Sequence, residues 1–160
     1  MANTILASGK VLHQLVIGQL QGISEDRFDI QARGFNNTIR WNAGHIVNWM
    51  DGYAALSFGV PSAIPPHYES LFGSGTKPSE WMIAPPSKEE LTEQLMAQLS
   101  RLSELTPEML DVKLQSPYQM GPFQFMTSGE LFNFALMHEA MHLGIISSQL
   151  KAMESDVALT

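Results

Sequence analysis

A stretch of 28 residues rich in proline and glycine, residues 59–86, separates the two helical halves of the chain. Each half holds two segments whose apolar residues recur at the three- and four-residue steps of a helix surface. The stretch is unusually long for a connection within a small domain, yet long enough to run the length of a helix bundle. The second and third helices can therefore run parallel, which favours a bundle with one crossover over a simple up-and-down bundle.

The predicted helices have recognisable beginnings. The second follows cap candidates in Asn36–Thr38. The third and the fourth begin with the S/T-x-x-E pattern of a capping box, at Ser87 and Thr127. The four helices are predicted over residues 3–22, 39–58, 87–106 and 127–152. No strand pattern stands out elsewhere, including in the irregular segment 106–126, so the predicted fold class is all-α.

Length and charge narrow the class of protein. The length of 160 residues suits one domain, predicted over residues 1–160. The 9 lysines and arginines stand against 16 aspartates and glutamates, a formal net charge of -7. No nucleic-acid partner is expected, because such binding depends on cationic side chains that neutralise phosphates. No apolar run approaches the roughly 20 residues of a membrane helix, and no signal peptide is evident. A soluble, cytoplasmic protein without a membrane partner is therefore expected.

The chain contains no cysteine. Disulfides, thiolate ligands and a cysteine nucleophile are thereby excluded, and a metal site must rest on nitrogen and oxygen ligands. Among the five histidines, His138 and His142 lie four residues apart in the fourth predicted helix. Side chains at this spacing are about 40° apart around the helix axis and can hold one ion between them. The surrounding residues are apolar, and a buried imidazole needs a polar partner or a metal.

The same segment matches H-E-x-x-H, in which the glutamate of a metalloprotease acts as general base on a zinc-bound water. The longer form of that motif fails, because Ile145 and Ser148 stand where a glycine and a third histidine are required. Protease chemistry is therefore disfavoured. Glu139 points about 100° away from His138 around the helix. It is a candidate catalytic residue, but we expect it to support the site or to face solvent.

A third ligand is available upstream. His45 lies about two turns into the second predicted helix, flanked by Trp41 and Trp49 on nearly the same face. Packed helix axes lie about 8–10 Å apart, so one histidine from this helix can meet the pair in the fourth helix. Three imidazoles leave coordination positions open, as in catalytic sites. Such ligands suit zinc or nickel best, with iron and manganese as alternatives.

The chain resembles the DinB/YfiT-like superfamily of small four-helix metalloproteins in two segments, N-T-I-R-W-N-A-G-H-I around His45 and H-E-A-M-H-L-G-I-I around His138 and His142. The resemblance extends over nearly the whole chain in length, helix order and histidine placement. It implies an up-down-down-up four-helix bundle with a long crossover loop between helices two and three. It also implies a divalent metal ion held by the three histidines and, commonly, a homodimer. Characterised relatives include bacillithiol S-transferases and mycothiol-dependent maleylpyruvate isomerases.

Other polar residues are given lesser roles. His13 in the first helix and His67 in the proline-rich loop are expected to be solvated or locally hydrogen-bonded. Asn42, Asn48 and Tyr53 of the second helix are placed to reach the pocket. Substrate specificity would come from the two irregular connections, whose conformation the sequence does not give.

Three hypotheses of function follow. The first is a metal-dependent enzyme that transfers a small-molecule thiol, such as bacillithiol or mycothiol, to an electrophilic substrate. With no cysteine in the chain, that thiol must arrive as a cosubstrate. The second is a hydrolase that uses a metal-bound water, with Glu139 as a proton relay. The third is a non-enzymatic, metal-stabilised dimeric bundle.

Overall fold

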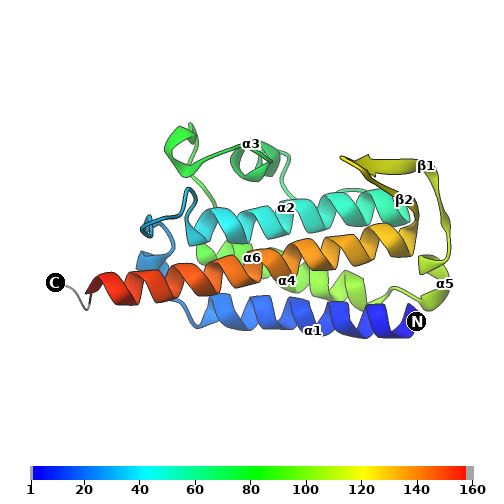
Figure 1. Cartoon of the computed structure of the whole chain (residues 1–160), viewed down its shortest axis with the longest axis horizontal. Coiled ribbons are helices and arrows are strands. Elements are labelled where there is room, and N and C mark those ends of the chain that lie inside the picture. Colours follow the sequence, from blue (N-terminus) through cyan, green and yellow to red (C-terminus); the bar gives the residue numbers. More distant parts are fainter. Residues whose placement is uncertain (1, 158–160) are drawn as a thin grey trace.

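Four long helices lie side by side in the computed structural model, which describes residues 2–157 (Figure 1). They are α1 (Ala2–Gln21), α2 (Ile39–Phe58), α4 (Lys88–Ser103) and α6 (Ser128–Val157). In Figure 1, α1 and α6 run in one direction, and α2 and α4 in the other. The structure is thus mostly helical, as predicted, and the long connection between α2 and α4 returns the chain along the bundle.

The helix starts follow the predicted caps. The Thr38 side chain accepts a hydrogen bond from the backbone N–H of Trp41 at the start of α2. Ser87 and Glu90 form both hydrogen bonds of a capping box at the start of α4. The hydroxyl of Thr127 accepts from the N–H of Glu130, whose carboxylate accepts from the N–H of Thr127 in return. These contacts satisfy N–H groups that have no partner within the helix.

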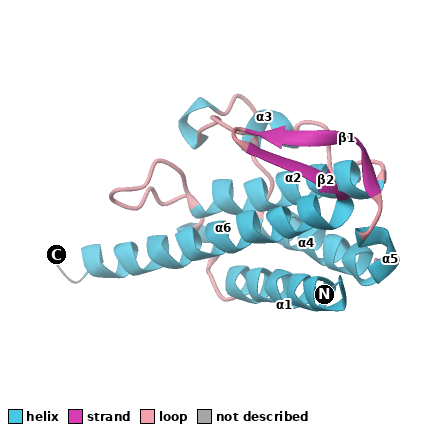
Figure 2. Ribbon diagram, turned by 45° about the vertical axis from the view of Figure 1, so that its right-hand side comes forward, coloured by secondary structure: helices cyan, strands magenta, loops and turns pink. Residues whose placement is uncertain are grey.

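The long connection between α2 and α4 is not featureless. It contains the short helix α3 (Tyr68–Phe72) and a 3-10 turn, η2 (Pro78–Glu80). Another 3-10 turn, η1 (Glu25–Arg27), lies between α1 and α2. Figures 1 and 2 show α3 lying against α2, on the same side of the bundle as the strands described next.

The prediction of a purely helical chain is wrong in the segment 106–126. After the short helix α5 (Pro107–Leu110), strands β1 (Lys113–Met120) and β2 (Phe123–Thr127) form an antiparallel hairpin (Figure 2). Gly121 makes the turn with a φ of 54°, a conformation that favours glycine. β1 is mostly exposed and contains Pro117, so it lacks the apolar–polar alternation by which half-buried strands are recognised.

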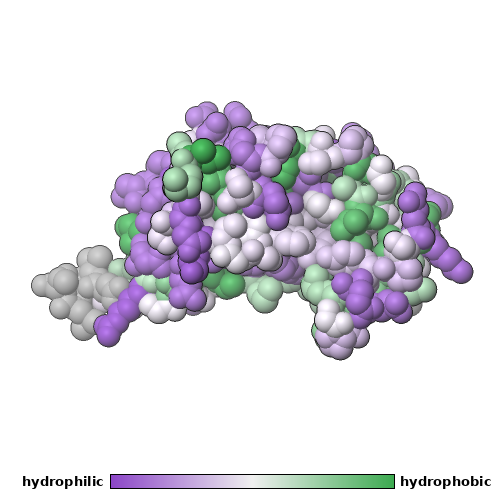
Figure 3. All heavy atoms as spheres, turned by 90° about the horizontal axis from the view of Figure 1, so that it is seen from above, coloured by the Kyte–Doolittle hydropathy of each residue, from purple (hydrophilic) through white to green (hydrophobic). Residues whose placement is uncertain are grey.

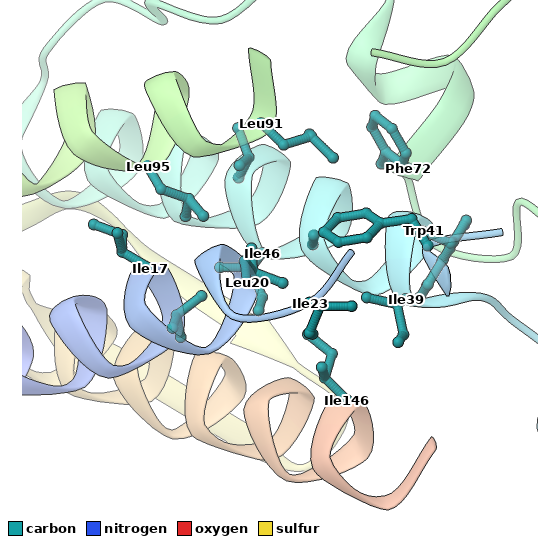
Figure 4. Packing of buried hydrophobic residues seen from close by; sticks show 14 of the residues in the cluster. Ile17, Leu20, Ile23, Ile39, Trp41, Ile46, Phe72, Leu91, Leu95 and Ile146 are labelled. Atoms are coloured by element: carbon teal, nitrogen blue, oxygen red, sulfur yellow. The ribbon is translucent and has the colours of Figure 1, made fainter. Parts of the chain in front are cut away.

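The apolar core consists of two clusters, one towards each end of the bundle. Figure 4 shows the first, in which side chains from all four long helices meet. It includes Leu20, Ile46, Leu95 and Ile146, all fully buried or nearly so. Phe72 of α3 packs against the same cluster, which ties the long connection to the bundle. Burial of these side chains supplies the main stabilisation of helix packing.

The second cluster lies at the opposite end of the helices and includes Leu6, Met50, Leu102 and Phe132. Between the two clusters, each long helix contributes buried polar groups, among them His13, His45, Gln98, Glu139 and His142. A polar layer therefore crosses the middle of the bundle. Buried polar groups must be hydrogen-bonded or bind ions, so this layer is where function is expected.

The surface adds two observations. Figure 3 looks onto the face that carries α3 and the hairpin, where hydrophobic residues lie in separate spots among hydrophilic and neutral ones. None of the helices in residues 2–157 is both long and apolar enough to cross a membrane.

Candidate metal centre

The structure brings together the three histidines identified in the sequence. His45 of α2 meets His138 and His142 of α6, and one nitrogen from each lies within 4.8 Å of the others. The Nε2 atoms of His45 and His138 are 3.3 Å apart. Two nitrogen ligands at a tetrahedral ion with bonds of about 2.0–2.1 Å lie about 3.3–3.4 Å apart. The spacing of this pair therefore matches that of two ligands of one ion.

Hydrogen bonds orient two of the three imidazoles. The Nδ1–H of His45 donates to the backbone carbonyl of Phe72 at 2.6 Å. Since a carbonyl only accepts, Nδ1 carries the proton and the lone pair of Nε2 points to the other histidines. His142 donates from Nδ1 to the side-chain oxygen of Asn42 at 2.8 Å, which leaves its Nε2 free in the same way. Hydrogen bonds of this kind fix the ring orientation of metal-binding histidines.

Asn42 is itself held in place. Its amide nitrogen donates to the carbonyl of Thr38 and to the side-chain oxygen of Gln149. The Gln149 amide donates in turn to the carbonyl of Asn37. With the nitrogen engaged on these acceptors, the oxygen of Asn42 must face His142. The chain of hydrogen bonds joins the start of α2 to the later part of α6, and sequence reasoning missed the part played by Gln149.

Burial keeps all three imidazoles neutral at pH 7, the form that binds a metal. His45 is 4% exposed and His142 is 7% exposed, whereas His138 is half-buried. Desolvation lowers the pKa of His45 to about 4, against the raising effect of the Phe72 carbonyl. Desolvation, aided by the two neighbouring imidazoles, lowers the pKa of His142 to about 3. The pKa of His138 is lowered by desolvation as well.

Aromatic rings surround the histidines on the α2 side. Trp41 stacks on His45 with ring centroids 4.3 Å apart, and Trp49 lies 6.1 Å from the same ring. The flanking positions predicted for both tryptophans are thereby confirmed. Tyr53 follows one turn later, with its ring 6.0 Å from that of His138. The centre therefore has an apolar wall, which strengthens electrostatic interactions inside it.

Close packing of α3 on α2 makes the His45 hydrogen bond possible. A Cβ atom at Gly44 would lie 2.4 Å from the ring of Phe72, so only glycine permits this approach. The Asn48 amide donates to the carboxylate of Glu69 at 2.7 Å and adds a polar link between the two helices. The sequence singled out Asn48 as a polar residue near the pocket, and the structure gives it this anchoring position.

A second buried pair lies beside the centre. The expectation that His13 is solvated or locally bonded is wrong, because its side chain is 0% exposed and bonds across the bundle. Its Nδ1 is 2.6 Å from a carboxylate oxygen of Glu139, and its Nε2 donates to the carbonyl of Leu95 at 3.0 Å. Glu139 is 1% exposed and turns towards α1, away from α2. His67, by contrast, is exposed at the start of α3, as expected.

The donor set fits a divalent ion. It consists of neutral imidazole nitrogens alone, two of them oriented by hydrogen bonds from their other ring nitrogen, and Glu139 is engaged elsewhere. Three nitrogen ligands with one half-buried member leave positions for a small molecule. A cavity of about 430 Å³ lies farther along the bundle, between the last turn of α2 and residues 113–118 of β1, so that Tyr118 is among its lining residues.

Comparison with protein families gives a match that contains the whole centre. The model of the DinB superfamily matches residues 11–146, most of the chain, including all three histidines of the centre and His13. No curated protein matches the chain.

Proposed function

The chain belongs to the DinB superfamily, and from the geometry of its centre we propose that it is a metal-dependent enzyme that transfers a small-molecule thiol to an electrophilic substrate. The observation that carries the proposal is the convergence of three neutral imidazoles from two helices. Two of them are oriented by groups that do not themselves belong to the centre. The third, His138, is half-buried and marks the side from which small molecules enter.

The residues of the chain have separate tasks in this proposal. His45, His138 and His142 hold the ion, and Phe72 and Asn42 keep two of the rings in register. A bound divalent cation would lower the pKa of the thiol and favour its thiolate at neutral pH. The aromatic wall of Trp41 and its neighbours keeps water from one side of the pocket. With no cysteine in the chain, the nucleophilic sulfur belongs to the cosubstrate.

The ion is proposed to be zinc or nickel, with iron and manganese as further candidates. An all-imidazole set suits each of these ions better than magnesium or calcium, which prefer oxygen ligands. Copper(I) is disfavoured because it prefers the softer sulfur ligands. Elemental analysis decides among the ions.

The hydrolase is a weaker candidate in this geometry. A base for a metal-bound water must lie within hydrogen-bond reach of it. Glu139 instead bonds to His13 and is almost fully buried on the α1 side. If a Glu139→Gln variant keeps its metal but loses all hydrolytic activity, the hydrolase hypothesis is supported. If the activity is unaltered, the role of Glu139 in hydrolysis is refuted.

We also propose that the protein is a homodimer. The side chains of Val11 and Leu15 on α1 and of Met137 and Met141 on α6 are more than half exposed, on two helices that pack against each other. Val11 and Leu15 lie one helical turn apart, as do Met137 and Met141, and exposed apolar spots of this kind are typical of protein interfaces. Light scattering coupled to size-exclusion chromatography measures the mass directly. The cytoplasmic location and the absence of a nucleic-acid partner stay predictions.

The test of the main proposal starts with protein purified without a metal-affinity tag. Elemental analysis should find about one divalent ion per chain, and His138→Ala should lose it. The metal-loaded protein is then screened for thermal shifts with low-molecular-weight thiols, bacillithiol and mycothiol among them. A thiol that raises the melting temperature only in the presence of metal supports the proposal. A chain that binds no ion, or whose metal content His138→Ala does not change, refutes it. Metal binding without any effect of thiols points to the non-enzymatic bundle.

A further inference from the structure

Hydrogen bonds account for most of the polar groups around the centre. The Nδ1–H groups of His45 and His142 both have acceptors, and so does the indole N–H of Trp41, which donates to Thr76. Both hydrogens of the Asn42 amide are engaged as well. On this side of the centre, towards α3 and the start of α2, these donors are therefore all satisfied within the protein.

The opposite side of the centre is different. Tyr53 and Trp49 lie one turn apart on α2, with ring centroids 5.3 Å apart, and both rings flank His138. The indole N–H of Trp49 is buried and has no acceptor among the described residues. The hydroxyl of Tyr53 forms no hydrogen bond with a described residue either. Buried polar groups without partners are uncommon, and a ligand that completes the hydrogen bonding is one explanation for them.

Tyr53 carries a polar hydroxyl at a position that is otherwise buried among aromatic rings. Its side chain is only 2% exposed, packed with Phe134 and Tyr118, whose rings lie 5.7 and 6.3 Å away. Burial and the nearby Tyr118 raise the pKa of Tyr53 to about 12, so the phenol keeps its proton at neutral pH.

The cavity near the hairpin lies on this same side. Tyr118 lines it and packs edge-on against the Tyr53 ring, which in turn packs against His138. The ring of Tyr53 therefore lies between a residue that lines the cavity and a histidine of the centre. This arrangement and the unused donors are independent observations, and both point to the same side of the centre.

We propose that the Tyr53 hydroxyl donates a hydrogen bond to an oxygen atom of the substrate bound at the histidine centre. The substrate that accepts the thiol therefore carries a carbonyl or carboxylate group, and Tyr53 is a catalytic residue that selects it. This inference rests on the proposed function, because the substrate is placed by an ion held between the histidines. It adds to that function a residue and a chemical class of substrate.

The test uses acetate as the probe and imidazole as its control. Cobalt(II) is loaded into the protein and each probe is titrated while the visible absorption of the ion is recorded. Acetate offers a second oxygen to the Tyr53 hydroxyl, whereas the outer nitrogen of a metal-bound imidazole is a donor and gains nothing from it. Tyr53→Phe should weaken acetate binding by about tenfold or more, since hydrogen bonds to charged groups are strong. The affinity of the Tyr53→Phe protein for imidazole should stay within about twofold of the parent protein's.

Tyr68→Phe is the matched variant. Tyr68 is also 2% exposed and its pKa is also raised to about 12 by burial, but it lies on α3, where its ring packs against those of His67 and Phe72. It should leave the affinities for both probes unchanged. Equal acetate affinity in Tyr53→Phe and the parent protein overturns the inference while the metal centre stands. Parallel losses of acetate and imidazole affinity also overturn it, because they indicate a damaged pocket. A protein that binds no cobalt refutes the proposed function and the inference with it.

Discussion

The buried contact between His13 and Glu139 allows a stability prediction with a definite magnitude. The two side chains are 0% and 1% exposed, and they meet at 2.6 Å in the polar layer of the bundle. Nε2 of His13 carries a proton because it faces a carbonyl, and the 2.6 Å contact between Nδ1 and the carboxylate requires a second proton on one of these two groups. The other oxygen of Glu139 already lacks a partner among the described residues. A His13→Leu substitution therefore leaves a carboxyl group buried without any hydrogen bond.

The cost depends on where this second proton resides. If it resides on the imidazole, the substitution strands a buried charge, and the free energy of unfolding should fall by about 3–5 kcal/mol. If it resides on the carboxyl group, the cost is that of an unsatisfied polar group, about 1–3 kcal/mol. Either loss is large against a total stability of about 5–15 kcal/mol. A loss in either range therefore shows that the contact contributes to the stability of the fold.

A double variant separates the pair from its surroundings. His13→Leu with Glu139→Met removes both polar side chains and keeps similar volumes, so neither member of the pair is left without its partner. Replacement of a buried pair by apolar residues is often neutral or stabilising by about 1–4 kcal/mol. The double variant should thus be more stable than His13→Leu alone, with a coupling energy of at least about 2 kcal/mol between the two sites.

Urea unfolding followed by circular dichroism measures these differences. The protein is treated with a chelator first, because Glu139 adjoins the ligand His138 and bound metal would add its own stabilisation. The reasoning is refuted if His13→Leu costs less than about 1 kcal/mol. It is also refuted if the double variant is as unstable as the two single variants combined, because the contact would then contribute nothing of its own.

Further predictions concern the centre and its support. Gly44→Ala should destabilise the protein by about 1–3 kcal/mol in thermal unfolding, because the new Cβ collides with the ring of Phe72 on α3. Gly52 lies on the same helix, but a Cβ there would meet nothing within 4 Å, so Gly52→Ala should stabilise the protein by about 0.5–1 kcal/mol. Asn42→Ala should weaken metal affinity about 10–100-fold in a competitive chelator assay, and the exposed Asn133→Ala should not change it. Chelation of the metal should lower the melting temperature by an amount that grows with the logarithm of the metal affinity, and an unchanged melting temperature would contradict metal binding by the folded state. The metal-free protein should lose stability as the pH falls from about 6.5 towards 4. The histidines of the unfolded chain take up protons in this range, whereas the buried imidazoles of His45 and His142, whose pKa values are lowered to about 4 and about 3, stay neutral. Stability independent of pH in this range would contradict the burial of these rings.

The parts of the structure that follow from local rules could be predicted from the sequence. Capping at Thr38 and Ser87 involves residues three positions apart, so the pattern is visible in the chain itself. The same holds for the stacking of Trp41 on His45, which needs only the four-residue spacing of a helix. The hairpin could not be predicted, because its first strand is exposed and the apolar residues do not alternate along it.

Contacts between distant segments are a different case. The partner of Asn42 is Gln149, 107 positions away, and the partner of His13 is Glu139, 126 positions away. Nothing in the local pattern of either residue names its partner. A histidine next to a leucine on an amphipathic helix reads as a boundary residue, and only the packing of α1 against α6 shows that it is buried. The hydrogen bond from His45 to the backbone carbonyl of Phe72 is still harder to predict, because every residue has such a carbonyl.

The orientation of side chains around α6 distinguishes the two interpretations of the H-E-x-x-H segment, a metal-binding pair and a metalloprotease motif. Residues four apart on α6 share one side of the helix, so His138 and His142 both face α2 and meet His45. Glu139 is turned by about 100° and faces α1, where it meets His13. The histidines and the glutamate of the motif therefore take part in two separate buried contacts, on two sides of α6. In a metalloprotease the glutamate must reach a water at the ion, and here α6 directs it to a different neighbour. The polar layer needs both contacts because it lies between two apolar clusters, where an unpartnered polar group is costly.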